Sequence, residues 1–230
     1  VITSGIAKLK DCEKALLIGV QVSVALVAFT PLIVNGPPFL PHTFFPFVVG
    51  KALYSRTLIE IAFGLWIVLA IRSPQFRIPR SWLIVVLAIY LVVSLFASVM
   101  GVSVQRSLWS TYERMQGIVD LAHWFAFTLV LTSMARSWLS WRALLNVNLA
   151  ISLLVAFLGL AQHYGFGDSV PIYRPGGQSI LATGTRLDIT LGNATYVGAY
   201  MLVNVFIGLG LLARSFGQEP RAKVSAAIER

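Results

Sequence analysis

The sequence contains little cysteine and little charge. A single cysteine, Cys12, stands among 230 residues, which excludes an intrachain disulfide framework and a cysteine-based metal cluster. Asp, Glu, Lys and Arg together make up 12% of the chain, about half of their share in an average soluble domain. With 57% hydrophobic residues and a mean hydropathy of +0.79, the composition excludes an ordinary soluble protein.

The signature motifs of several large enzyme classes are also missing. The chain has no Walker loop, no dinucleotide-binding glycine fingerprint, no HExxH zinc motif and no nucleophile elbow. Its three histidines, His42, His123 and His163, are too widely separated in the sequence to indicate a metal site. We therefore expect no cofactor and no bound metal.

Long apolar runs are the dominant feature that is present. Six segments of about 18 to 22 residues match the thickness of a bilayer core, because an α-helix rises about 1.5 Å per residue. They predict an all-α, multi-pass membrane protein with six transmembrane helices. The predicted spans are Lys14–Val34, Ala52–Ile71, Trp82–Met100, Ile118–Ala135, Ala143–His163 and Tyr196–Ala213.

The residues between the spans define the predicted organisation of the chain. Residues 1–13 form an N-terminal arm, residues 14–213 form the membrane domain, and residues 214–230 form a tail or the start of a second half. The three longer loops, 35–51, 101–117 and 164–195, carry most of the aromatic and turn-forming residues outside the spans. Binding groups in membrane proteins are often placed on such loops.

Lysine and arginine are unequally divided between the two sides of this arrangement. The net charge is +9. Of the 18 basic residues, 12 lie on the side of the two termini: Lys8, Lys10, Lys14, Arg72, Arg77, Arg80, Arg136, Arg142, Arg214, Arg221, Lys223 and Arg230. The positive-inside rule then predicts that both termini are cytoplasmic and that the three longer loops face outward. Basic residues at helix ends indicate membrane lipids, and not nucleic acid, as partners.

Two opposite charges lie inside the second predicted span. Arg56 and Glu60 are four residues apart, which places them on one face of a helix. Ionisable residues inside a span are costly and usually face the interior of a helix bundle or a wet cavity. The pair indicates either a structural ion pair that locks two helices together or a polar pocket beneath the outer surface.

The fourth predicted span carries Asp120 and His123 near its start. At this spacing the carboxylate can orient the imidazole, which is the arrangement that a general base often needs. The alternative is a pair of ordinary polar residues at the membrane boundary.

The segment before the last predicted span contains Arg186, Gly192 and Asn193. Gly192 permits a close approach of the backbone, and Asn193 or Thr195 can cap the helix that follows. Because the N–H groups at a helix start attract anions, Arg186 with this turn indicates either a phosphate site or simple helix capping.

Three segments together resemble a known family. They are residues 44–60 (FFPFVVGKALYSRTLIE), residues 108–117 (LWSTYERMQG) with His123 after them, and residues 186–200 (RLDITLGNATYVGAY). They resemble the O-antigen ligase and polymerase superfamily, which comprises bacterial membrane glycosyltransferases with undecaprenyl-diphosphate-linked glycans as donors. The resemblance covers roughly residues 15–213, and TYERMQG and TLGNATY are its more specific parts.

The resemblance implies a larger helical enzyme of the bacterial inner membrane, of which this chain covers the N-terminal half. By this resemblance Arg114 and Arg186 contact the donor diphosphate, and Gly192 and Asn193 form the small turn before a helix. Arg56 and Glu60 would then support the cavity.

The chain departs from the family pattern at two points. The family usually has Gly at the position of Ile189, so we expect a stiffer turn here. Its catalytic histidine lies in the second half, which this sequence does not include. Within the chain, His123 and Asp188 are the only candidates for the general base, and both are weak.

The sequence therefore supports an O-antigen-ligase-like glycosyltransferase, or its N-terminal half, acting on the outer face of the membrane. The alternative is a non-catalytic structural or assembly subunit that packs against other membrane subunits. A small transporter is less favoured, because we find no inverted repeat and no pair of broken helices in matching positions.

Overall fold

The computed structural model describes residues 10–34, 47–112, 114–135, 138–166 and 186–228, and these contain helices and no strand. The chain divides into two compact units, Val1–Trp141 and Arg142–Arg230. The first unit contains α2 (Asp11–Val27), η1 (Thr30–Leu32), α3 (Val49–Arg72), η2 (Pro74–Phe76), α4 (Trp82–Val99), α5 (Val104–Trp109) and α6 (Ile118–Met134). The second contains most of α7 (Trp138–His163), followed by η4 (Ile189–Leu191) and α8 (Ala194–Ile228).

The predicted all-α membrane protein is confirmed in its coarse form. Four helical segments are long and apolar enough to cross a membrane: Val49–Arg72, Trp82–Val99, Trp141–His163 and Ala194–Phe216. Helix α6 is apolar but shorter, with 17 residues. Six spans with both termini in the cytoplasm stay a prediction.

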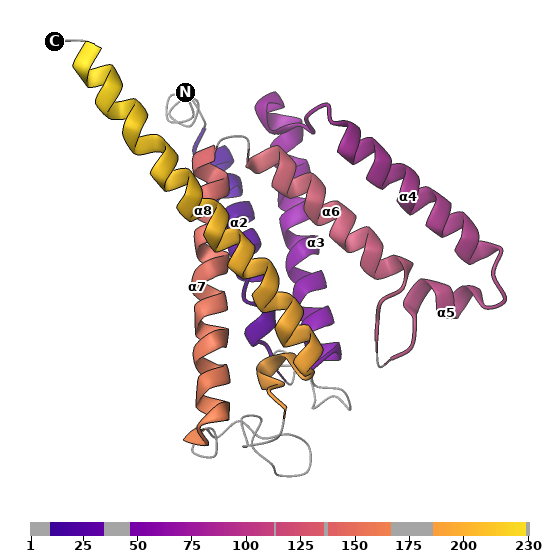
Figure 1. Ribbon diagram of the computed structural model, residues 1–230. Helices are drawn as coiled ribbons and strands as arrows, with labels where there is room; N and C mark the ends of the chain where they lie inside the picture. Colours follow the sequence, from indigo (N-terminus) through magenta and orange to yellow (C-terminus); the bar gives the residue numbers. More distant parts are fainter. Residues whose placement is uncertain (1–9, 35–46, 113, 136–137, 167–185, 229–230) are drawn as a thin grey trace. The chain divides into compact units, whose positions relative to one another are not determined.

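The helices of the first unit are arranged in the order α2, α3, α6 and α4 (Figure 1). Helices α2 and α3 approach each other closely, because a Cβ built on Gly19 would lie 3.0 Å from Leu65 Cδ1. The Tyr54 hydroxyl of α3 donates a hydrogen bond to the Leu26 carbonyl oxygen of α2 at 2.9 Å. The core between the two helices contains the buried side chains of Leu17, Val20, Val24, Ile59, Ala62, Trp66 and Leu69.

Proline sets the end of α3. Ser73 precedes Pro74, and the residue before a proline is disfavoured in the helical conformation. Ser73 is accordingly extended, with φ −126° and ψ 100°, and the chain turns through η2. The Trp66 indole nitrogen closes this turn by donating a hydrogen bond to the Phe76 carbonyl oxygen at 3.0 Å.

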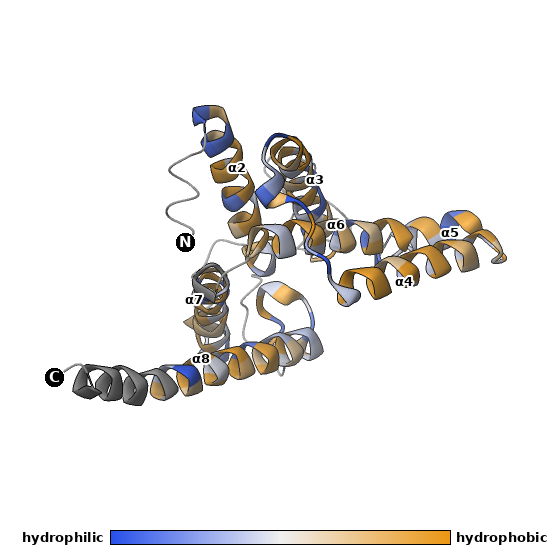
Figure 2. Ribbon diagram, turned by 90° about the horizontal axis from the view of Figure 1, so that it is seen from above, coloured by the Kyte–Doolittle hydropathy of each residue, from blue (hydrophilic) through white to orange (hydrophobic). Residues whose placement is uncertain are grey.

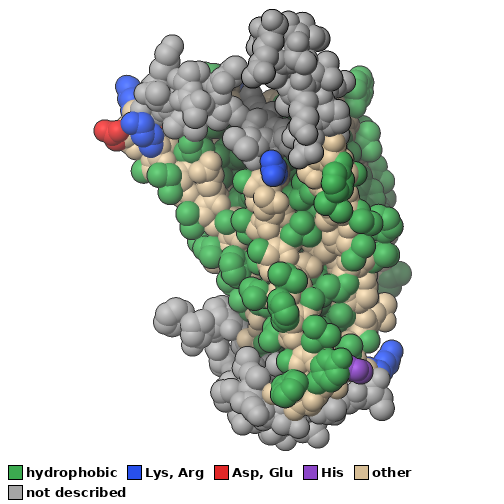
Figure 3. Space-filling model, turned by 60° about the vertical axis from the view of Figure 1, so that its left-hand side comes forward, with side chains coloured by type: hydrophobic (Ala, Val, Ile, Leu, Met, Phe, Trp, Pro, Cys, Tyr) green, Lys and Arg blue, Asp and Glu red, His purple; other side chains and the backbone are tan. Residues whose placement is uncertain are grey.

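Helix α4 presents apolar side chains on most of its surface. Only Ile84 and Ser98 of its 18 residues are buried, whereas Val86, Ile89 and Val93 are more than half exposed. Figure 2 shows α4 as an almost continuous hydrophobic ribbon. On the face drawn in Figure 3, hydrophobic side chains likewise cover the length of the helices, and the charged side chains that are visible lie toward the helix ends. Such surfaces are suited to lipid or to further apolar helices.

Several predicted boundaries need correction. The loop predicted at residues 101–117 contains the short helix α5, and α2 begins at Asp11, inside the predicted arm. Helix α8 continues to Ile228, so the predicted tail is helical. Residues 1–9, 35–46 and 167–185 of the predicted arm and outward loops lie outside the described residues.

In the second unit, α7 and α8 are joined by polar groups. The Asn148 side-chain amide donates a hydrogen bond to the Asn204 side-chain oxygen at 2.6 Å, and the Asn204 amide donates to the Tyr200 carbonyl oxygen at 2.9 Å. Interhelical side-chain hydrogen bonds of this kind stabilise membrane helices by about 0.6 kcal/mol on average.

Candidate functional site: a polar network between α3 and α6

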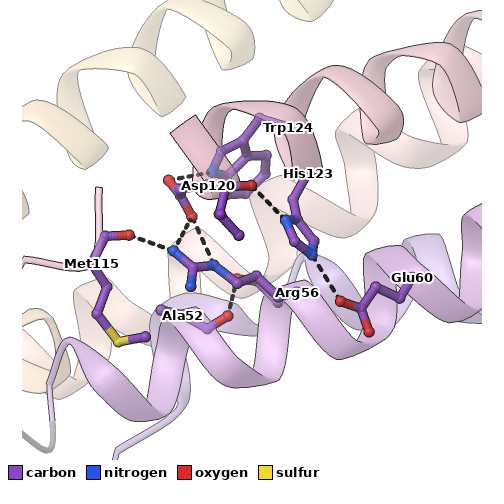
Figure 4. Close-up of polar contacts among 9 residues, drawn as sticks. Ala52, Arg56, Glu60, Met115, Asp120, His123 and Trp124 are labelled. Carbon is purple, nitrogen blue, oxygen red and sulfur yellow. Dashed lines mark hydrogen bonds and ion pairs between the residues drawn. The ribbon is translucent and has the colours of Figure 1, made fainter. Parts of the chain in front are cut away.

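Arg56 lies on the face of α3 that packs against α6, and its side chain is 8% exposed. Its Nε and Nη2 atoms donate hydrogen bonds to Oδ1 of Asp120 on α6 at 3.2 and 3.1 Å. Charge-assisted bonds of this kind are about twice as strong as bonds between neutral groups. Arg56 and Asp120 therefore join the two helices as a buried ion pair (Figure 4).

Two further groups complete this ion pair. The second oxygen of Asp120 accepts a hydrogen bond from the Trp124 indole at 3.2 Å. Nη2 of Arg56 also donates to the Met115 carbonyl oxygen in the turn before α6. Arg56 thus fixes both the helix and the turn that leads into it.

Glu60 lies one turn further along α3 and bonds to His123. Its Oε1 is 2.9 Å from His123 Nε2, and His123 Nδ1 is 2.6 Å from the Val119 carbonyl oxygen. The expectation that Asp120 orients His123 is therefore wrong. At positions i and i+3 of α6, both side chains reach across to α3, where Arg56 and Glu60 offer opposite charges one turn apart. The prediction that Arg56 and Glu60 share a helical face is confirmed, but the ion pair that locks the helices is Arg56–Asp120.

The turn before α6 presents Arg114. The Thr111 carbonyl oxygen accepts hydrogen bonds from the N–H groups of Arg114 and Met115 at 3.0 and 2.8 Å, and Met115 has a left-handed backbone with φ 50°. A Cβ on Gly117 would overlap the Leu108 carbonyl group, so this position requires glycine. Arg114 is exposed at the tip of this tightly closed turn.

The family-like segment at residues 186–200 is held by Gln162, a residue that sequence reasoning missed. The Gln162 amide donates a hydrogen bond to Asp188 Oδ1 at 2.9 Å, and its oxygen accepts one from the Ile189 N–H at 3.0 Å. The spacing of 26 and 27 residues left no local signal for either contact. The only feature of the sequence that could have indicated a role for Gln162 is its position as a polar residue near the end of an apolar span.

Ile189 has a left-handed backbone, a conformation that glycine adopts most readily. Its φ is 45°, an unusual value for a β-branched residue, and its side chain is 1% exposed. A Cβ on Gly159 would lie 2.9 Å from Ile189 Cδ1, so the absence of a side chain on α7 makes room for Ile189.

The turn that follows leads into α8 as the sequence predicts. Gly192 is left-handed, with φ 74°, and Asn193 Oδ1 accepts a hydrogen bond from the Thr195 N–H at 2.9 Å. Asn193 therefore caps the helix. Arg186 is exposed, and the carboxylate of Asp188 is engaged by Gln162.

The predicted site residues thus fall into two groups. Arg56, Glu60, His123 and Arg114 belong to the first unit, and the set Arg186, Asp188, Gly192 and Asn193 belongs to the second. Among the described residues, no group of three or more His, Cys, Asp or Glu side chains is placed to hold a metal ion. No family model, curated protein or solved structure matches the chain.

Proposed function

We propose that this chain is part of an O-antigen-ligase-like membrane glycosyltransferase of the bacterial inner membrane. It would transfer a glycan from a polyprenyl-diphosphate donor to an acceptor on the outer face. The observation that carries the proposal is shared by two of the family-like segments, residues 108–117 and 186–200. Each contains a left-handed residue other than glycine, and each of these is held by a polar side chain from a neighbouring helix.

Backbone of this kind costs about 1–3 kcal/mol per residue and gathers at functional sites, where the surrounding structure maintains it. In the first segment Arg56 holds the Met115 carbonyl, next to the exposed Arg114. In the second segment Gln162 holds the Ile189 N–H, three residues after the exposed Arg186. Arg56 and Gln162 therefore each hold a segment that carries an exposed arginine.

The chemistry of the proposed reaction calls for such arginines. When the glycan leaves the lipid carrier, negative charge develops on the diphosphate, and a guanidinium group can bind two of its oxygens at once. We assign this contact to Arg114 and Arg186. In the second unit, Gly192 and Asn193 would bring the N–H groups at the start of α8 to the anion that Arg186 contacts.

In this proposal Arg56 is a positioning residue and does not contact the donor. Its guanidinium is buried and bonded to Asp120 and Met115. Glu60 supports the same helix pair through His123. The general base would be the histidine that the resembling family carries in its second half, because His123 and Asp188 are already bonded to Glu60 and Gln162.

A non-catalytic assembly subunit is the second candidate, and α4 favours it. The apolar surface that α4 exposes is suited to a partner helix as well as to lipid. In that case Arg114 and Arg186 would not affect any glycan transfer.

The test is glycan transfer in membranes that contain the complete gene product, with an undecaprenyl-diphosphate-linked glycan as donor. We expect Arg114→Gln to lower the rate by about 10²-fold, as the loss of one charge-stabilising contact does elsewhere. Arg106→Gln is the matched control, because Arg106 is also exposed and lies on the neighbouring α5. Equal rates for both variants, at equal membrane levels, would favour the assembly subunit.

A further inference from the structure

The hydrogen bonds of His123 determine where its protons lie. Nδ1 is 2.6 Å from the Val119 carbonyl oxygen, which can only accept a hydrogen bond. Nδ1 therefore carries a proton. Nε2 faces Glu60 Oε1 at 2.9 Å, and this contact needs one proton between the two atoms.

That proton can belong to either partner. On His123 it makes an imidazolium beside a carboxylate, and on Glu60 it makes a neutral acid beside a neutral imidazole. Both arrangements have the same total charge. Without the proton, a lone pair on Nε2 would face a carboxylate, and with a second proton the attraction between opposite charges would be lost.

The position of Glu60 in α3 makes the net charge of the pair important. Glu60 lies about 16 Å from the start of α3 and about 18 Å from its end, at 1.5 Å of rise per residue. Its side chain is 66% exposed, whereas that of His123 is 17% exposed. A lone carboxylate at this depth of a bilayer is costly, and a pair that holds one proton has no net charge.

Among the described residues of the first unit, the helices packed against α3 and α6 supply no competing group at this level. On α3 and α6 the nearest ionisable neighbours are Arg56 and Asp120, which neutralise each other. Helix α4, which packs on α6, contains Tyr90 and no Asp, Glu, Lys, Arg or His.

Helix α2, which packs on α3, carries its ionisable side chains only at its start. There Cys12 and Glu13 contact Arg72 and Ser73 at the end of α3. On α5, which contacts α6, the basic residue is the exposed Arg106. Lys51 lies at the start of α3 and donates to the Ile33 carbonyl oxygen.

We propose that Glu60 and His123 form a protonation site within the membrane, which binds a single proton and uses it to hold α3 against α6. Proton uptake or loss by the pair weakens this contact, while Arg56 and Asp120 keep the helices joined one turn away. Neither residue of the pair contacts the donor in the proposed glycan transfer, which relies on Arg114 and Arg186 for that contact.

The experiment is ¹⁵N NMR of histidine-labelled protein in liposomes across a pH series. The chain contains three histidines, so His123→Asn identifies the signal of His123 by its disappearance. We expect Nδ1 to be protonated throughout and Nε2 to show a shared proton at neutral pH. In Glu60→Gln the shared-proton signal of Nε2 at neutral pH should be lost, because no carboxylate then faces this nitrogen.

Glu13→Gln is the matched control, because Glu13 is a carboxylate of the same unit that bonds to Ser73. It should leave the His123 signal unchanged. An Nε2 signal of His123 at neutral pH that is the same in Glu60→Gln as in the unaltered protein would overturn the proposal. If Glu60→Gln does not fold, the unaltered protein still decides the question, since a free lone pair on Nε2 at neutral pH would also overturn it.

Discussion

Met115 and Ile189 show how single residues in this chain depend on distant partners. Both have left-handed backbone, with φ of 50° and 45°. Arg56 reaches Met115 from α3, and Gln162 reaches Ile189 from α7. Each strained residue is therefore kept in place by a helix that is remote in the sequence. Substitution of Arg56 or Gln162 should alter the conformation of the turn that it holds.

Gly117 provides the sharpest test at this scale. Substitution by alanine would drive a Cβ into the Leu108 carbonyl group, so the turn that carries Arg114 must shift. We expect Gly117→Ala to lower the free energy of unfolding by about 1–3 kcal/mol, as overpacking does in other proteins. The measurement is thermal unfolding in detergent, followed by circular dichroism.

Gly101→Ala is the control for this substitution. A Cβ there would lie 3.4 Å from the Ala97 carbonyl oxygen, which is ordinary contact. The two variants should differ clearly in their unfolding temperatures. If Gly117→Ala is as stable as Gly101→Ala, the turn has a different structure from the one described.

At the scale of whole elements, α3 and α6 are joined through their ion pair. Asp120→Asn would leave Arg56 buried without an anion, and breaking a buried pair in this way costs about 3–5 kcal/mol. The double variant Arg56→Met, Asp120→Leu removes both charges and should lose less. Unfolding by SDS in mixed micelles measures both values.

Comparing the stability lost in the two variants separates the contribution of the Arg56–Asp120 ion pair from that of its surroundings. A loss in the double variant as large as that in Asp120→Asn would mean that the charges contribute little. The lost stability would then belong to the Met115 contact or to packing.

The start of α2 and the end of α3 are joined by Glu13. Hydrogen bonds from the Ser73 hydroxyl at 2.9 Å and the Lys10 N–H at 3.0 Å lower the pKa of the Glu13 carboxyl below its ordinary value of 4.5. Because the folded pKa is the lower one, the stabilisation is complete above pH 4.5 and is lost as the pH falls through the folded value.

Ser73→Ala should therefore lower the unfolding temperature above pH 4.5. The difference in unfolding temperature between this variant and the unaltered protein should become smaller in more acidic buffer. Thermal unfolding over a pH series measures this. Glu13 is only partly buried, so the effect should be small. A difference that grows as the pH falls would contradict this role of Glu13.

The sequence predicted elements well where an apolar run has sharp ends. Helix α4 was expected at Trp82–Met100 and is found at Trp82–Val99, and α6 was expected at Ile118–Ala135 and ends one residue earlier. Helix α5 was missed, because its six residues include Gln105, Arg106 and Ser107 and form no apolar run. The cross-helix partners, above all Gln162, could not be predicted, because contact between remote residues leaves no periodic pattern.

At the scale of the whole molecule, the open question of topology depends on α2. Its 17 residues extend about 26 Å, somewhat less than the core of a bilayer of about 30 Å. The turn after α2 and the 3-10 helix η1 extend the coiled backbone to Leu32. The whole segment is therefore close to the length that is needed to cross the bilayer core. We therefore expect α2 to cross the membrane together with α3 and α4.

Three crossings would place Cys12 and Arg106 on opposite sides, with Cys12 in the cytoplasm. Cys12 is exposed and is the only cysteine in the sequence, so it reports its own side without further changes. In spheroplasts, a membrane-impermeant maleimide should label Cys12 only after lysis. The variant Cys12→Ser, Arg106→Cys should be labelled in intact spheroplasts. If both thiols behave alike, α2 lies along the membrane surface, only α3 and α4 separate the two positions, and the first of the six predicted spans is wrong.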